Sequence, residues 1–109
     1  MKLLSELIAK PITAFTDLDY VYHYFKPASK TAPYAVWMEQ NEDSFHGDNE
    51  KAERCLEGVM EFYTQTPQDP KLDEIEAALQ SMSGSWSLTA VQYEEDTALI
   101  HFSWDWSVD

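Results

Sequence analysis

The sequence predicts an α+β protein in which a mostly antiparallel sheet of about five strands has two helices packed on one face. Two observations lead to this fold class. Residues 69–82 combine a helix start signal with helical periodicity, and several other segments are rich in strand formers. The expected order is helix, two strands, long loop, strand, helix, two strands. A chain of 109 residues has the length of a single domain.

The first helix is expected over residues 2–10, where apolar residues recur at helical spacing. Pro11 should end it, because proline lacks a backbone donor and clashes with the preceding turn. Residues 20–25 and 33–39 are dense in strand-forming residues and are separated by a polar loop. We expect these two segments to pair as a hairpin.

Residues 40–51 are polar and contain turn-forming residues, so they are expected to form an exposed loop with one aromatic side chain, Phe45. Residues 55–64 fit both helical and strand spacing. We favour a strand because Gly58 is a poor helix former, and because strand periodicity places Glu57 and Glu61 on one polar face.

The second helix is expected to begin with Asp69 as N-cap and Pro70 at the first helical position, and to end at Gly84 in a left-handed cap. Its apolar stripe consists of Leu72, Ile75, Ala78, Leu79 and Met82. Residues 86–93 and 98–106 should be the last two strands, joined by a polar turn at 94–97. Strand periodicity directs one row of the last strand at the core: Ile100, Phe102, Trp104 and Trp106. Asp105 falls on the opposite face.

The charge is strongly one-sided, with seven Lys and Arg against 20 Asp and Glu and a formal net charge of −13. Residues 1–40 contain four of each sign, so the whole excess lies in residues 41–109. A chain of this kind lacks the cationic surface that phosphates require, which excludes direct nucleic-acid binders and proteins that adhere to anionic membranes. Its 14% aromatic content also excludes a disordered acidic tail.

The cellular setting is inferred from three absences in the sequence. Cys55 is the single cysteine, so no internal disulfide can form, which fits a reducing compartment. No apolar run reaches the length of a spanning helix, and Glu6 comes too early for a signal-peptide core. We expect a soluble protein, without membrane partners, that is made in the cytoplasm.

No motif with catalytic or metal-binding spacing stands out. His23, His46 and His101 lack the close spacing of zinc ligands, and Cys55 has no second cysteine. There is no nucleophile elbow and no glycine-rich phosphate loop. We therefore expect no catalytic residues, no metal and no cofactor, and the function should reside in surfaces.

An ordered set of segments provides a resemblance over about residues 20–106. The segments are Pro33-Tyr34-Ala35-Val36-Trp37, then Phe45 with Gly47-Asp48-Asn49, then residues 59–64, residues 68–79, and Tyr93-Glu94-Glu95. In this pattern the chain resembles the small tail-terminator or tail-completion proteins of long-tailed bacteriophages and prophages. Related head-to-tail joining proteins share the plan.

The resemblance implies a non-enzymatic subunit that assembles into a ring, commonly a homo-hexamer, which caps the tail tube and meets the head connector. It implies an assembly interface at Phe45, His46, Asp48 and Asn49, and a channel-facing position for Glu57 and Glu61. The expected location is the virion tail or the head–tail interface, after synthesis in the bacterial cytoplasm. DNA would pass without specific binding, since walls of its own charge do not hold phosphates. Mutual repulsion predicts a monomer at low salt and high dilution.

The same charge allows a reading from another class. In an acidic DNA mimic, carboxylates imitate phosphates and occupy the groove of a nuclease or another DNA-binding protein. Glu57, Glu61 and the acids of residues 94–96 would have to form one continuous face for this role.

Overall fold

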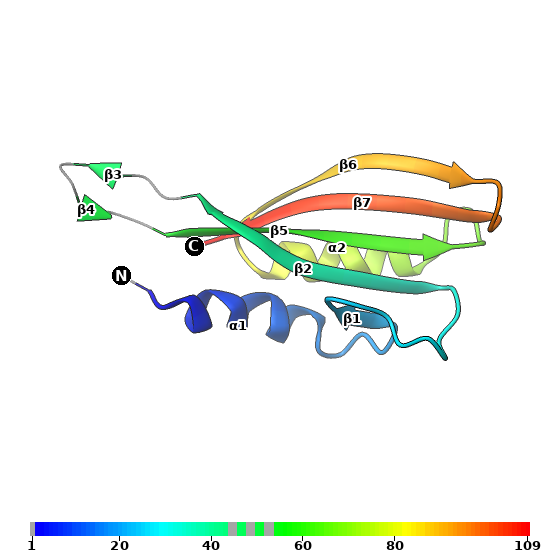
Figure 1. The fold of residues 1–109 in the computed structure, drawn as a ribbon, viewed down its shortest axis with the longest axis horizontal. Helices are drawn as coiled ribbons and strands as arrows, with labels where there is room; N and C mark the ends of the chain where they lie inside the picture. Colours follow the sequence, from blue (N-terminus) through cyan, green and yellow to red (C-terminus); the bar gives the residue numbers. More distant parts are fainter. Residues whose placement is uncertain (1, 44–45, 48–49, 52–53) are drawn as a thin grey trace.

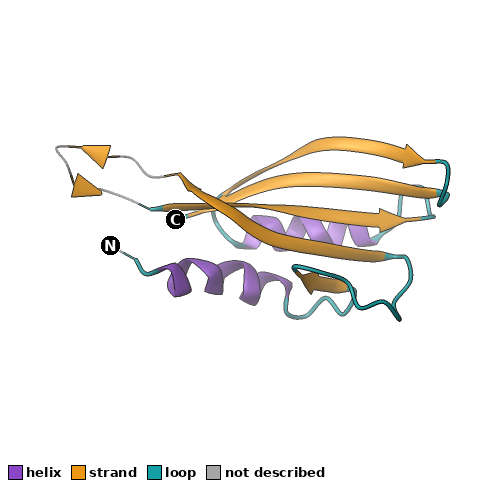
Figure 2. Cartoon of the chain, in the orientation of Figure 1, coloured by secondary structure: helices purple, strands orange, loops and turns teal. Residues whose placement is uncertain are grey.

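A computed structural model describes residues 2–43, 46–47, 50–51 and 54–109. A five-stranded sheet in the order β1-β2-β5-β7-β6 lies on two helices, and both helices cover the same face (Figure 1). The α+β fold predicted from the sequence is confirmed. The helices are α1 (Leu4–Phe15) and α2 (Lys71–Ser81), and the sheet strands are β1 (Val21–His23), β2 (Tyr34–Asp43), β5 (Cys55–Thr64), β6 (Ser85–Glu94) and β7 (Leu99–Val108). Strands β3 (His46–Gly47) and β4 (Glu50–Lys51) form a separate ladder (Figure 2).

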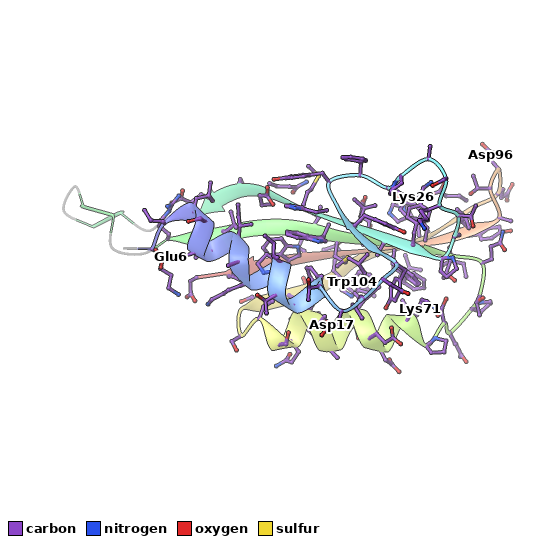
Figure 3. The ribbon with its side chains drawn as sticks, turned by 90° about the horizontal axis from the view of Figure 1, so that it is seen from below. Glu6, Asp17, Lys26, Lys71, Asp96 and Trp104 are labelled. Atoms are coloured by element: carbon purple, nitrogen blue, oxygen red, sulfur yellow. The ribbon has the colours of Figure 1, made fainter. Side chains whose placement is uncertain are left out.

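The core lies between the sheet and the two helices. Of the apolar row predicted for the last strand, Trp104 and Trp106 are buried at 1% and 2% exposure and Phe102 is partly buried against the core, whereas Ile100 is only half-buried. Figure 3 shows Trp104 between the sheet and the helices, and its indole Nε1 donates to Glu76 of α2 at 2.9 Å. From α2, the core receives Ile75, Ala78, Leu79 and Met82, as the helical spacing predicted. No helix among the described residues is both long and apolar enough to span a membrane.

The first helix is longer than predicted, because it continues through Pro11 to Phe15. Proline inside a helix costs about 3 kcal/mol, so the extension needs compensation from packing. Leu7, Pro11 and Phe15 are buried on one side of α1, and the Phe15 ring lies 5.4 Å from that of Trp37. Burial of this far end of the helix offsets the lost backbone hydrogen bond.

The predicted hairpin between the first two strands is wrong, because β1 runs parallel to β2. His23 lies beside Trp37 in this register, and their rings stack with centroids 3.8 Å apart and an interplanar angle of 5°. Tyr24 then adopts a positive φ of 75° and turns the chain out of the sheet. Residues 24–33 lead the chain back to the end of the sheet at which β1 began. Strand β2 therefore starts at that end and runs in the same direction as β1.

The predicted loop over residues 40–51 is only partly a loop. Strand β2 extends to Asp43, with an irregularity between Glu39 and Asn41, and β3 pairs antiparallel with β4. The polar stretch therefore contains strand pairing that turn-forming residues alone did not reveal. Antiparallel neighbours satisfy their backbone groups whatever their side chains, so polarity did not exclude a strand.

Helix α2 begins at Lys71 with Pro70 as N-cap, one residue later than predicted, although Pro70 already has helical dihedral angles. Asp69 is 6% exposed, and its carboxylate accepts hydrogen bonds from Lys71 N at 2.9 Å and from the Thr64 hydroxyl at 2.7 Å. The predicted C-terminal signal is wrong, because Ser83 and not Gly84 has the left-handed φ, of 59°. Gly84 is required for a different reason: a Cβ on it would lie 1.8 Å from the Ser107 carbonyl oxygen of β7.

Candidate functional site: the outer face of the sheet

The outer face is the side of the sheet that points away from α1 and α2. Along β5, buried residues alternate with half-buried ones, and the half-buried set includes Glu57 and Glu61. Both carboxylates therefore lie on the outer face, as strand periodicity predicted. Glu94 ends β6 at the level of Leu99, and Asp105 is exposed on β7 opposite Ser87. The outer face thus receives acids from three adjacent strands.

A row of stacked rings crosses this face at one end of the sheet. Tyr34 of β2 stacks on Tyr63 of β5 with centroids 4.8 Å apart, and Tyr63 stacks on His101 of β7 at 4.2 Å. The Lys26 ammonium lies 5.1 Å from the centroid of the Tyr34 ring, a cation–π distance. This row could not be predicted from the sequence, because it depends on which residues of distant strands become neighbours.

His101 lies between two carboxylates. Its Nε2 is 3.4 Å from Glu61 Oε1, its Nδ1 is 3.5 Å from Glu94 Oε1, and the Ser103 hydroxyl oxygen is 3.4 Å from Nε2. The imidazole is 16% exposed. These separations exceed the usual hydrogen-bond range, so the three groups surround the imidazole without a close hydrogen bond to it.

Burial and the acids of the outer face together raise the pKa values of two neighbouring tyrosines, Tyr63 and Tyr34. Burial raises the pKa of Tyr63 to about 12, with further contributions from Glu61, Tyr34 and Glu94. The pKa of Tyr34 is also raised, first by burial and then by Glu94 and Glu61. The phenols therefore remain neutral at physiological pH, and the carboxylates set the sign of the local potential.

The other end of the outer face forms a shallow hollow of about 300 Å³. Its lining includes the acids Glu57 and Asp105 and three serines, Ser85, Ser87 and Ser107. Asn41 Nδ2 donates to Glu57 Oε1 at 2.7 Å. No Lys or Arg occurs in β5, β6 or β7, so these three strands contribute no cation that could attract a phosphate.

The structure tests little of the assembly interface implied by the resemblance. Phe45, Asp48 and Asn49 lie outside the described residues. His46 begins β3, but its side chain lies outside the described part of the chain. Glu57 and Glu61, for which the resemblance implies a channel-facing position, both lie on the outer face, Glu57 beside Asn41 and Glu61 beside His101.

His23, on the opposite edge of the sheet from β6, has contacts of a different kind. His23 of β1 contacts Glu39 Oε2 through Nε2 at 2.8 Å and stacks on Trp37, so it has a structural role at the edge of the sheet. Within the described ranges, no group of three or more His, Cys, Asp or Glu side chains is arranged to hold a metal ion.

No model of a known protein family matches this chain. No curated protein sequence matches it either.

Proposed function

We propose that this chain is a structural subunit of a long-tailed bacteriophage or prophage, a tail terminator or head–tail joining protein that assembles into a ring. The observation that carries the proposal is the outer face: acids from β5, β6 and β7 lie on the side opposite the helices, and these strands contain no Lys or Arg. In the proposed ring this face lines the channel.

The physical argument concerns the passage of DNA. Duplex DNA binds proteins largely through Lys and Arg, which displace counterions from the phosphates. A wall that presents Glu57, Glu61 and Asp105 instead repels phosphates, so DNA would slide without being held. Glu61 and Glu94 also flank His101, so carboxylates surround the one histidine of this part of the wall.

The proposed partners are further copies of the chain, the tail tube protein and the head–tail connector. The proposed location is the tail or the head–tail interface of the virion, after synthesis in the bacterial cytoplasm. No enzymatic activity and no cofactor form part of the proposal.

The alternative function, an acidic DNA mimic, requires carboxylates that are free to imitate phosphates. Several acids of this chain already have donors from the chain itself. Glu74 accepts the Tyr20 hydroxyl at 2.7 Å, Glu76 accepts the Trp104 indole, and Glu42 receives two hydrogen bonds from Arg54 at 2.9 and 3.0 Å. These hydrogen bonds connect different segments of the fold, so these carboxylates are not free to imitate phosphates. This favours the ring subunit over the DNA mimic.

The test combines assembly with partner identification. Because each copy has a formal charge of −13, we expect monomers in dilute low-salt buffer and rings when salt or tail tubes are added, measured by sedimentation and electron microscopy. Rings that cap tubes of the tail protein encoded nearby would support the proposal. A stable complex with a basic DNA-binding protein, without binding to tubes, would instead support the mimic.

A further inference from the structure

Strand β6 forms one edge of the sheet and differs in charge from the rest of the acidic part of the chain. Residues 77–93 contain no charged side chain, so β6 is neutral from Ser85 to Tyr93. Its outer edge pairs with no other described strand. Edge strands are commonly protected from pairing with another chain by lysine, proline or a β-bulge. Strand β6 has no lysine or proline, and its register with β7 shifts once, between Leu88 and Ala90.

Strand β6 also exposes apolar side chains on the helix side of the sheet. Its partners in the register with β7 place Leu88, Val91 and Tyr93 on the same side as the buried Trp104. Helix α2 leaves these three residues 47%, 53% and 63% exposed. A row of three exposed apolar residues next to an unpaired backbone edge is typical of an interface.

The opposite edge of the sheet has an apolar cleft on the same side. The cleft lies between α1 and the β1–β2 edge, measures about 350 Å³, and is lined mainly by Ile12, Phe15, Leu18, Val21 and Trp37, with the His23 ring. Figure 1 shows α1 and β1 together at this edge, with β6 at the other. One copy therefore presents apolar side chains on one edge and an apolar cleft on the other.

The two edges also match in level along the strands. Val91 of β6 pairs with Phe102, Phe102 with Phe62, Phe62 with Ala35, and Ala35 with Val21 of β1. Val91 and Val21 therefore lie at the same height on the two opposite edges of the sheet. In the same way, the paired residues Trp104, Met60 and Trp37 connect Leu88 of β6 to His23 of β1, so these two residues also lie at the same height. A neighbouring copy placed edge to edge, without a shift along the strands, would bring Val91 to Val21 and Leu88 to His23.

Charge complementarity points to the same arrangement. Residues 24–33, at the β1 edge, include Lys26 and Lys30, whereas the β6–β7 turn includes Glu95 and Asp96. Figure 3 shows Lys26 and Asp96 at the same end of the molecule. In the edge-to-edge arrangement, the lysines of one copy would approach the acids of the next.

We infer that copies of this chain associate head to tail, with β6 of one copy docked antiparallel against the β1–α1 edge of the next. The direction follows from the topology, since β1 and β6 run in opposite directions within one sheet. A two-fold β6–β6 contact would leave the cleft empty and would bring the acidic β6–β7 turns of both copies to the same interface. A head-to-tail contact repeats with one orientation, which closes into a ring or grows as a filament. The head-to-tail contact itself does not depend on the proposed function; only the closure of the contacts into a ring rests on it.

The first experiment compares two variants that introduce the same charge on adjacent residues of β6. Val91→Glu places a carboxylate on the side that enters the cleft, whereas Gln92→Glu places one on the outer face. Both positions are exposed in one copy, so both monomers should melt like the wild type. We expect Val91→Glu to weaken association by about tenfold or more in sedimentation, and Gln92→Glu to have a much smaller effect. Equal effects would overturn the inference.

The second experiment uses cysteines in a Cys55→Ser background. Residues opposite one another in an antiparallel pair have Cα atoms about 5 Å apart, within disulfide range. We expect Val21→Cys mixed with Val91→Cys to give a disulfide-linked heterodimer, and the Val21→Cys, Val91→Cys double variant to give a ladder of linked oligomers. Homodimers of Val91→Cys alone, oligomers without disulfides, or no association would each overturn the inference.

The two proposals can fail separately. Disulfide-linked rings that never cap tail tubes would refute the proposed function and leave the head-to-tail contact standing. Rings that cap tail tubes but in which Val21 and Val91 cannot be linked would support the proposed function and refute the head-to-tail contact.

Discussion

The indole of Trp106 lies directly over Gly58, its partner on the neighbouring strand. A Cβ built on Gly58 would be 2.1 Å from Cζ2 of Trp106 and 2.4 Å from the Met38 carbonyl oxygen. Trp106 is 2% exposed, so a displacement of its ring would disturb the core around it. Glycine at this position is what allows a tryptophan to pack flat against the middle of the sheet.

We therefore expect Gly58→Ala to destabilise the protein by about 3 kcal/mol, at the upper end of the usual cost of overpacking. The measurement is equilibrium unfolding by denaturant. Trp106→Leu should cost less in the Gly58→Ala background than in the wild type, because the smaller side chain relieves the clash. A Gly58→Ala protein as stable as the wild type would contradict the packing described here.

Asp69 joins the end of β5 to the start of α2. Asp69→Ala removes the acceptor for Lys71 N and for the buried Thr64 hydroxyl, and we expect a loss of about 2 kcal/mol. Asp73→Asn is the matched control, since Asp73 also lies in the first turn of α2 but is exposed. The control should change the free energy of unfolding by less than about 0.5 kcal/mol. Similar losses in the two variants would indicate a general charge effect at the helix end.

The raised pKa of Tyr63 predicts a loss of stability in alkali. The unfolded phenol ionises near 10.0 and the folded one at about 12, so between these values the folded state holds more protons than the unfolded state. The free energy of unfolding therefore falls as pH rises through this window, and the contribution is fully present below pH 10. Tyr63→Phe should show a shallower fall in denaturant titrations. An unchanged slope would show that Tyr63 does not ionise on unfolding as described.

The channel-facing position of Glu61 can be tested with DNA. In assembled rings, we expect Glu61→Lys to retain duplex DNA at low salt and to release it as salt rises, because a lysine neutralises phosphates and displaces their counterions. Asp73→Lys makes the same charge change on the exposed surface of α2 and should retain little DNA. The measurement is co-sedimentation with linear DNA over a salt series. Equal retention by the two variants would place the channel elsewhere.

Local signals were sufficient for the elements whose determinants lie close together in the sequence. The start of α2 was predictable because Asp69 caps a backbone group only two residues away. The polar face of β5 was predictable because alternation is a property of one strand, and Glu57 and Glu61 lie on the face that alternation indicates. The parallel pairing of β1 with β2 was not predictable, since strand-forming residues do not encode direction.

The sequence by itself determined the fold class, the net charge of −13 and the identity of the residues that face the core on β5 and β7. These properties depend on composition and on periodicity within a segment. Only the tertiary structure decided that α1 continues through Pro11, that Tyr34, Tyr63 and His101 form one row, and that an apolar edge strand lies level with an apolar cleft. Each of these depends on contacts between distant segments, and the packing energy of such contacts can exceed local preferences.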